Sequence, residues 1–384
     1  MQFEPGRKEA WAKVIDDFNA QSKSVEVEFV GWPFAEYSNQ MLTQVQAGGL
    51  EADLITAPPD LASRLFALDA FDPMTEAIDA AGVTPDPGLH KFVTKDGKIY
   101  GVSVVTVSFG LLYNQAVLGA AGLEPATNVD DWVAQAAELT RRPDSFGLIA
   151  ANTMAEQANW WFQLQNWVNA YDGTWAEGKT PLVTSGPVVK TLELYKRMYE
   201  GAIPQGSNDA QQMELMANGR GSQALLVSAT VNVLKSTNPE VYKELRSIPA
   251  PWASKKGTAR VHPISLYSGS RNKNAANEFL SWLLEPEHMA DLTMESLDML
   301  APYPQLNEVP AFETYLKDLP WVEGYMGIDP VTPMDLMGDF INANDEFGNI
   351  VLSHFQSSLT GGVPVADAMG KAQAELEALA GRLG

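Results

Sequence analysis

Residues Lys8–Val30 read KEAWAKVIDDFNAQSKSVEVEFV, and two periodicities in this stretch decide the fold class. In its first half, apolar side chains recur at i, i+3, i+4 and i+7, namely Trp11, Val14, Ile15 and Phe18. That spacing predicts a helix with one apolar face. In its second half, Val25, Val27 and Phe29 occupy alternate positions, which predicts a strand at Val25–Val30.

The alternation of helix and strand continues along most of the chain. Further strands are expected at 52–56, 102–113, 146–150, 223–228 and 264–267. Further helices are expected at 130–139, 155–168, 187–199, 334–355 and 364–383, with one carrying Leu61, Leu65 and Leu68 and one ending at 213–217. This order predicts an α/β protein whose parallel sheet is covered by helices.

Composition narrows the functional classes. The chain has 384 residues, which favours two or three lobes, and it has no cysteine, which excludes thiol catalysis and cysteine-ligated metal. Forty-eight acidic residues against 26 basic ones give a formal charge of −22. Such a surface repels nucleic acids and anionic lipid, so no nucleic-acid partner is expected.

The sequence gives no membrane segment and no secretory signal. Its longest charge-free stretch, Ile99–Leu123, is rich in polar residues and glycine, which favours a buried strand over a spanning helix. The start, Met1 followed by Gln2, Phe3 and Glu4, has neither a basic region nor an apolar one. Two alternatives stay open from the residues alone: a cytoplasmic protein, or an exported one in its processed form.

The motif matches do not support an enzyme. Gly173–Thr180 fits the GxxxxGK[ST] phosphate-binding pattern, but an aromatic helix precedes it and Pro181 follows, so we interpret it as a surface turn. Ser270–Lys273 fits SxxK without its partner motifs. The four histidines, at 90, 262, 288 and 354, lack metal-type spacing. We therefore expect no catalytic residue, no metal and no cofactor.

Aromatic residues are the remaining signal. Trp160, Trp161 and Phe162 are consecutive, and Trp167, Tyr171 and Trp175 follow closely. Most tryptophans are packing residues. Because Trp160 and Trp161 are neighbours on a helix, we expect one of them to point away from the core. An aromatic ring beside asparagine and glutamine side chains can stack on a sugar ring and bind its hydroxyls.

Short segments in a specific order resemble a known family. They are Lys8–Asn19 with Val25–Val30, Glu36-Tyr37 with Leu42, Ala52-Asp-Leu-Ile, Asp96-Gly-Lys-Ile-Tyr-Gly-Val, Leu111-Leu-Tyr-Asn114, Ala121-Gly-Leu-Glu-Pro125, Leu192–Lys196, Met216-Ala-Asn-Gly219, Ala224-Leu-Leu-Val and Asn272–Leu280. Together they resemble family 1 of the extracellular solute-binding proteins, which serve ABC sugar importers and include maltose-binding protein.

The resemblance implies a periplasmic-binding-protein type II fold with two discontinuous lobes around a central cleft. Lobe one would comprise 1–107 with 261–302, and lobe two 108–260 with 303–384. The function implied is that of a monomeric, periplasmic or extracellular receptor. It would bind a sugar, glycoside or polyol reversibly, close around it, and deliver it to the membrane subunits of an ABC permease. The alternative is a glycoside-processing enzyme with two cleft carboxylates.

The resemblance also implies ligand-binding positions. They are Phe3, Glu4, Trp32, Phe34, Asp60, Ser108, Asn159, Trp160, Trp161, Ser228, Thr230, His262 and Tyr303. Val107 stands where the maltose binder has an acid, and Ser228 with Thr230 where it has a Gly-Pro-Trp stacking site, so we expect a ligand other than maltodextrin. The family begins with a buried central strand. We therefore expect either that Met1–Phe3 is the tail of that strand, or that further residues precede it.

Overall fold

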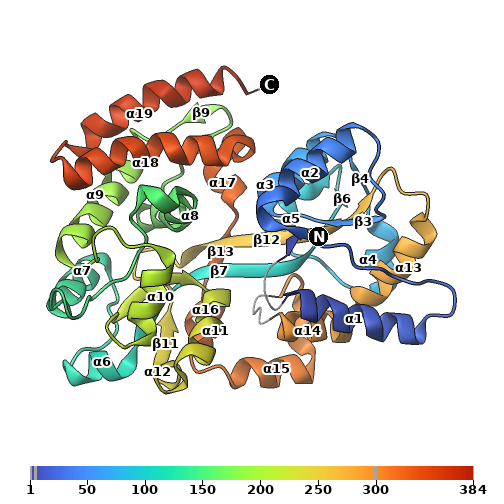
Figure 1. Cartoon of the computed structure of the whole chain (residues 1–384), viewed down its shortest axis with the longest axis horizontal. Helices are drawn as coiled ribbons and strands as arrows, with labels where there is room; N and C mark the ends of the chain where they lie inside the picture. Colours follow the sequence, from blue (N-terminus) through green and yellow to red (C-terminus); the bar gives the residue numbers. More distant parts are fainter. Residues whose placement is uncertain (1, 4–6, 297–300, 384) are drawn as a thin grey trace. The chain divides into compact units, whose positions relative to one another are not determined.

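A computed structural model describes residues 2–3, 7–296 and 301–383. The chain divides into two compact units. Figure 1 shows their elements, coloured by position in the sequence. Unit 1 comprises Met1–Val107 with Arg260–Leu319, and unit 2 comprises Ser108–Ala259 with Pro320–Gly384. The last division lies beyond the expected break at 302/303, because Leu306, Val309 and Phe312 pack into the core of unit 1.

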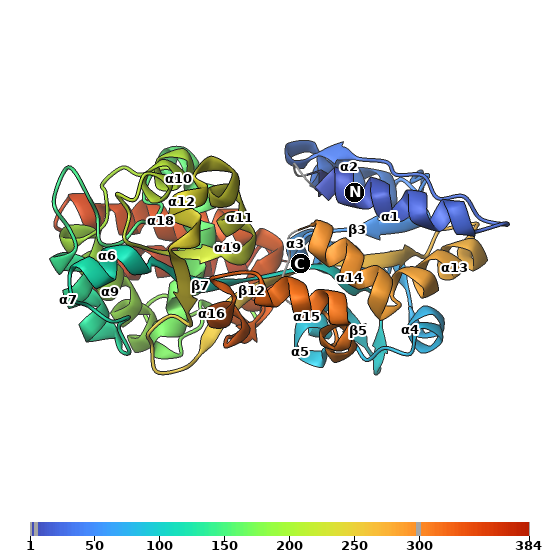
Figure 2. The same cartoon turned by 90° about the horizontal axis from the view of Figure 1, so that it is seen from below.

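The elements of unit 1 are β1 (Gln2–Phe3), α1 (Arg7–Gln21), β2 (Trp32–Pro33), α2 (Phe34–Gln46), β3 (Leu54–Thr56), α3 (Pro59–Ala67), β4 (Phe71–Asp72), α4 (Thr75–Ala81), α5 (Pro87–His90), η1 (Lys91–Val93), β5 (Thr94–Lys95), β6 (Lys98–Ile99), α13 (Lys273–Leu283), α14 (Pro286–Glu295), η4 (Pro304–Glu308) and α15 (Pro310–Lys317). Helix α1 packs on α14, and α4 packs on α13 (Figure 2).

Two long strands, β7 (Val102–Asn114) and β12 (Lys256–Tyr267), contribute to both units. The other elements of unit 2 are α6 (Gln115–Ala120), α7 (Val129–Glu138), η2 (Met154–Glu156), α8 (Gln157–Trp167), η3 (Val168–Tyr171), β8 (Ala176–Glu177), β9 (Thr180–Pro181), α9 (Gly186–Gly201), α10 (Asp209–Ala217), β10 (Gln223–Val227), α11 (Ser228–Thr237), α12 (Pro239–Lys243), β11 (Leu245–Ile248), α16 (Val322–Met326), β13 (Asp329–Val331), α17 (Pro333–Met337), η5 (Gly338–Ala343), α18 (Asn344–Thr360) and α19 (Val365–Ala380).

The expectation of a parallel sheet is only partly correct. β1 pairs with β2 and β12 pairs with β13 in parallel. In unit 1, however, β3 and β4 pair antiparallel with β12, and in unit 2, β10 and β11 pair antiparallel with β7. Each of β7 and β12 passes from one unit into the other and is not reached through a βα crossover. Because that crossover is what makes two successive strands parallel, no parallel pairing is required of these two strands.

Most expected elements are present, and two expected strands are not. Residues 25–30 form no described strand, and residues 146–150 make only single bridges, Phe146 to Gly221 and Ile149 to Ala224. The helix expected to end at 213–217 is α10. It begins with a capping box between Asn208 and Gln211, and Gly219 follows it with φ +67°.

The segment that fits the phosphate-binding pattern is a hairpin. β8 pairs antiparallel with β9, and Gly178 turns between them with φ +52°. Lys179 donates from Nζ to the carbonyl oxygen of Leu383 at 2.6 Å. A phosphate-binding loop needs a strand before it and a helix N-terminus after it, so the surface-turn interpretation is confirmed.

Each unit has its own apolar core. That of unit 1 lies among α1, α13, α14, α15 and the neighbouring strands. That of unit 2 is rich in aromatic rings from α8, α9 and α18, to which α19 adds aliphatic side chains. Helices α18 and α19 lie side by side at the C-terminal end of the chain (Figure 1). Of the helices in the described part of the chain, none combines the length and the apolarity that crossing a membrane requires.

Candidate functional site

In unit 1, an acidic side chain lies at a strand-to-helix turn. β3 ends at Thr56, and α3 begins at Pro59, with Asp60 in its first turn. Proline suits the first helical position because it has no N–H to leave unpaired. The half-buried Asp60 has no hydrogen-bond partner among the described residues, so its carboxylate can accept hydrogen bonds from a hydroxyl ligand.

In unit 2, two serines lie beside each other where β10 ends: Ser228 begins α11, and Ser108 lies within β7. The antiparallel ladder pairs Val227 of β10 with Phe109 of β7, so Ser228 and Ser108 are the next residues along it. Both are fully buried, and within the described part of the chain neither hydroxyl has a partner. A buried polar group without a partner costs about 1–3 kcal/mol and calls for an explanation. Thr230 lies half-buried in the first turn of α11.

Asn159 lies half-buried on α8, near an acidic pair. Burial raises the pKa of the Asp209 carboxyl, the charge of Glu156 raises it further, and the Asn159 amide opposes both. The Glu156 carboxylate accepts a hydrogen bond from the main-chain N–H of Asp209 at 2.9 Å. This pair therefore stabilises the start of α10, where negative charge is favourable.

Trp160 and Trp161 both lie in the core of unit 2, with exposures of 0% and 2%. The expectation that one would point away from the core is wrong. α8 packs against α18 and lies within the aromatic core, so its two adjacent tryptophans find separate apolar neighbours in the same core. Trp161 packs on Trp175 and Phe347 and donates to Asn344 Oδ1 at 3.0 Å, so neither ring presents a free face to a sugar.

Tyr303 belongs to the core of unit 1 and not to unit 2 as expected. It is 1% exposed, and its hydroxyl donates to the carbonyl oxygen of Leu284 at 2.7 Å. Burial raises the pKa of this phenol far above its ordinary value. Tyr303 thus has no free polar group for a ligand.

The other predicted positions lie in unit 1. Phe3 is in β1, Trp32 is in β2, Phe34 begins α2, and His262 is half-buried in β12. Because β1 pairs with β2, the main chains of Phe3 and Trp32 lie on neighbouring strands. Glu4 lies outside the described residues.

Asparagines on the aromatic segment were not singled out from the sequence. The buried Asn166 accepts a hydrogen bond from the main-chain N–H of Thr258 at 2.8 Å, and Asn169 donates to the Thr258 hydroxyl at 3.2 Å. The Nδ2 group of Asn166 is buried without a partner among the described residues. The available signal was the occurrence of amides in a segment otherwise made of large apolar residues.

A cavity of about 790 Å³ lies within unit 1 and contains none of the predicted ligand-binding residues. Among the residues that the structure describes, no three carboxylate or histidine side chains gather as metal ligands would.

Comparison with known proteins places the chain in a family of solute-binding proteins. A family model described as bacterial extracellular solute-binding protein matches residues 13–317. No curated protein matches the sequence.

Many solved structures share the fold over the whole chain. One is the sugar-binding protein MalE of Xanthomonas citri, at 17% identity and TM-score 0.84, covering 100% of this chain and 96% of that one. A solute-binding protein of Thermotoga lettingae bound with α-D-tagatose matches at 18% and 0.79, over 99% and 98%. One of Agrobacterium radiobacter bound with ribitol matches at 18% and 0.76, over 98% and 97%.

These likenesses, at full length of both chains, show the two-lobe MalE-like fold that the sequence resemblance implied. The family match, over residues 13–317, covers most of the chain and takes in most of unit 1 and the first segment of unit 2. This chain therefore belongs to the bacterial extracellular solute-binding protein family.

Proposed function

We propose that this protein is the substrate-binding receptor of an ABC importer and binds a sugar, glycoside or polyol reversibly and without turnover. It works outside the cytoplasmic membrane as a monomer and delivers its ligand to the permease subunits. The observation that carries the proposal is the pair of buried hydroxyls of Ser108, in β7, and Ser228, at the start of α11, which have no partner among the described residues, in a chain of this family. Tagatose- and ribitol-bound relatives of the same fold support the ligand class.

The chemistry of these two hydroxyls suits a polyhydroxyl ligand. A serine hydroxyl donates one hydrogen bond and accepts two, which matches the donor and acceptor character of a sugar hydroxyl. In α/β proteins, ligands bind beyond the carboxyl ends of strands, and β10 and β3 both end at a strand-to-helix turn. We propose Asp60, Ser108, Asn159, Ser228 and Thr230 as the side chains to test first.

A thermal-shift screen with sugars, polyols and sugar acids tests the function. A ligand that binds only the native state raises the melting temperature, by an amount that grows with its concentration above Kd. We expect at least one neutral sugar or polyol to do so, and calorimetry with that ligand to show saturable heat without product. No shift with any compound of these classes would contradict the proposal.

Serine variants test the site. We expect Ser108→Ala and Ser228→Ala each to weaken binding by about 0.5–1.5 kcal/mol, roughly 2- to 12-fold in Kd, through a lost hydrogen bond. The free energy of unfolding without ligand should be unchanged, since no protein partner is lost. The matched control is Ser265→Ala, which removes another buried, unpartnered hydroxyl, in the unit 1 part of β12. Equal affinity in all three variants would exclude Ser108 and Ser228 as ligand-binding residues.

The Asp60 proposal has its own variant. If Asp60 accepts hydrogen bonds from ligand hydroxyls, Asp60→Ala should weaken the binding free energy by about 1–3 kcal/mol, which raises Kd roughly 5- to 150-fold. Asp367→Ala, which removes another first-turn carboxylate, from α19, is the control and should leave Kd unchanged.

The second candidate function is glycoside hydrolysis, and the raised pKa of the Asp209 carboxyl beside Glu156 is what favours it. Incubation with oligosaccharides and analysis for reducing ends decides between the two. Sustained product release that Asp209→Asn abolishes would establish the enzyme and exclude a pure receptor.

A further inference from the structure

The first turn of α11 differs from that of the two helices it packs against. α11 contacts both α10 and α12 in unit 2 (Figure 1). α10 and α12 begin after Asn208 and Asn238, whose side chains accept hydrogen bonds from main-chain N–H groups, and each has an acidic residue in its first turn. α11 begins after Val227, which has no polar side chain, and its first turn has no acidic residue. The start of α11 therefore has no negative group of its own.

Such a helix start attracts negative charge. The first N–H groups of an α-helix have no partner within the helix, and the aligned peptide dipoles place a partial positive charge there. A capping side chain normally accepts from the N–H of the second or third helical residue. In α11 these are Ala229 and Thr230, and no described side chain caps them. Both residues are half-buried, so a ligand from solvent can reach their N–H groups.

Two buried hydroxyls lie at the same end of α11. Ser228 is its first residue, Ser108 lies beside it on β7, and both side chains are fully buried. Neither hydroxyl has a hydrogen-bond partner among the described residues. A serine hydroxyl can rotate to donate to whatever acceptor is present, and an anionic acceptor gives the stronger hydrogen bond. The helix start thus offers two hydroxyl donors in addition to its main-chain donors.

The elements around these donors carry almost no charge. β7, β10 and α11 contain no aspartate and no glutamate, although the chain has 48 acidic residues. The one charged residue in these three elements is Lys235, in the last turn of α11. An anion at the start of α11 therefore meets no carboxylate from the elements that bind it.

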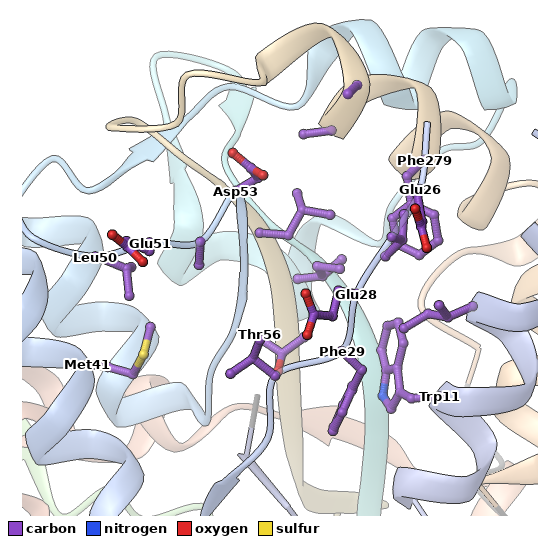
Figure 3. A pocket seen from close by; sticks show the side chains of 18 of the residues that line it. Trp11, Glu26, Glu28, Phe29, Met41, Leu50, Glu51, Asp53, Thr56 and Phe279 are labelled. Carbon is purple, nitrogen blue, oxygen red and sulfur yellow. The ribbon is translucent and has the colours of Figure 1, made fainter. Parts of the chain in front are cut away.

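The cavity of about 790 Å³ in unit 1 has the opposite character. Its lining includes the carboxylates of Glu26, Glu28, Glu51 and Asp53, which Figure 3 shows beside the space. The described residues that line it include no lysine, arginine or histidine. Charges of like sign repel one another, so this cavity does not suit an anionic group. Of the two places, the start of α11 is the one that does.

We propose that the start of α11, together with Ser108 and Ser228, binds an anionic group of the ligand, either a carboxylate or a phosphate. The inference rests on the proposed function and names its ligand class: sugar acids, or phosphates of sugars and polyols. The anion accepts hydrogen bonds from the N–H groups of Ala229 and Thr230 and from the two serine hydroxyls. A neutral hydroxyl is the weaker partner, because its oxygen accepts at most two hydrogen bonds and carries no charge to interact with the helix dipole.

Matched pairs of ligands test the ligand class. Calorimetry at pH 7.5 compares D-glucuronate with D-glucose, D-gluconate with D-glucitol, and sn-glycerol 3-phosphate with glycerol. We expect the charged member of at least one pair to bind roughly tenfold more tightly than its neutral partner, or more, because hydrogen bonds to a charged group are about twice as strong as neutral ones. The first two pairs test a carboxylate and the third tests a phosphate, so the pair that responds identifies the anionic group.

Inorganic phosphate tests the place of binding independently of any sugar. We expect it to shift the main-chain amide resonances of Ala229 and Thr230, and NaCl at the same ionic strength to leave them in place. In Thr230→Glu, a carboxylate at the third helical position can reach the start of the helix itself. This variant should lose the phosphate-induced shift at Ala229 and should melt roughly 1–3 °C higher without ligand. The matched control is Thr237→Glu, which adds the same charge at the last residue of α11 and should keep the phosphate response.

Three outcomes would overturn the inference: charged members that bind no more tightly than their neutral partners in every pair, amide shifts at Ala229 that NaCl reproduces, or a phosphate response that persists in Thr230→Glu. Tight binding of the neutral members alone would leave the proposed function intact. Failure of the proposed function has a different signature, because hydrolysis of a bound glycoside would refute the receptor without removing a preference for charged ligands.

Discussion

His90 shows how one buried side chain makes stability depend on pH. Its Nε2 accepts a hydrogen bond from the main-chain N–H of Ser103 at 3.0 Å, and its Nδ1 lies 2.7 Å from the carbonyl oxygen of Asp86. Only the neutral ring with its proton on Nδ1 satisfies both contacts. Burial lowers the pKa of this imidazole below 6.5, against a smaller opposing effect of Asp86.

Unit 1 should therefore lose stability on mild acidification. A group whose pKa is lower in the folded state gives its full stabilisation above its unfolded pKa, here 6.5, and loses it as the pH falls toward the folded pKa. Hydrogen exchange of unit 1 amides at pH 7.5, 6.5 and 5.5 measures this, after correction for intrinsic rates. His90→Gln should flatten the pH dependence of exchange in unit 1. The control His354→Gln, which alters an exposed contact with Glu375, should not flatten it. Identical pH profiles for wild type and His90→Gln would contradict the assignment.

At the scale of elements, two glycines on neighbouring helices have opposite roles. Gly348 is buried on α18, and a Cβ there would lie inside the van der Waals contact distance of the Trp161 ring on α8. Gly370 is exposed on α19 and has no such neighbour within 4 Å. The close approach of α18 to α8 thus depends on the missing side chain at 348.

Alanine at these two positions should change stability in opposite directions. We expect Gly348→Ala to lower the free energy of unfolding by about 1–3 kcal/mol, because the Trp161 ring or the helix must shift. Gly370→Ala should raise it by about 0.5–1 kcal/mol, because alanine loses less backbone entropy in a helix. Denaturant titrations of both variants measure the difference. Equal effects would show that Trp161 and α18 are not in the described contact.

Helices were predictable from local sequence, and strand pairing was not. The apolar spacing in Lys8–Asn19 and the proline near the start of α9 correctly indicate helices, whose hydrogen bonds are local. Val25–Val30 has the alternation of a strand but no strand assignment, because a strand also needs a partner from elsewhere in the chain. Trp160 and Trp161 were misjudged for a similar reason: which sides of a helix are covered depends on the elements packed around it.

At the scale of the whole molecule, the dominant property is charge. A formal charge of −22 gives a net repulsion within the folded state, which dissolved salt screens. Raising NaCl from about 0.01 M to about 0.3 M should therefore raise the melting temperature by a few degrees, because the Debye length falls well below the size of a unit. The Kd of a neutral sugar should stay constant over the same range. A melting temperature that falls with added salt would contradict this prediction.

The site was less predictable than the fold. The order of short segments was enough to indicate the family, because sequences that share such a pattern adopt the same fold even when most of their individual residues differ. Individual ligand positions depend on burial and on the partners that each side chain finds. Those are tertiary properties, and they removed Tyr303 while they left Ser108 and Ser228 as candidates.

The course of β7 and β12 through both units also constrains how this protein can be made. Unit 1 begins with the first residues of the chain, yet β12, the partner of both β3 and β4, comes from residues synthesised after nearly all of the first part of unit 2. During translation, β3 and β4 therefore lack their partner strand β12 until the ribosome has passed Tyr267. A nascent chain in this state has no finished unit to fold early, so it stays open to chaperones and to passage through a narrow translocation channel for most of its synthesis.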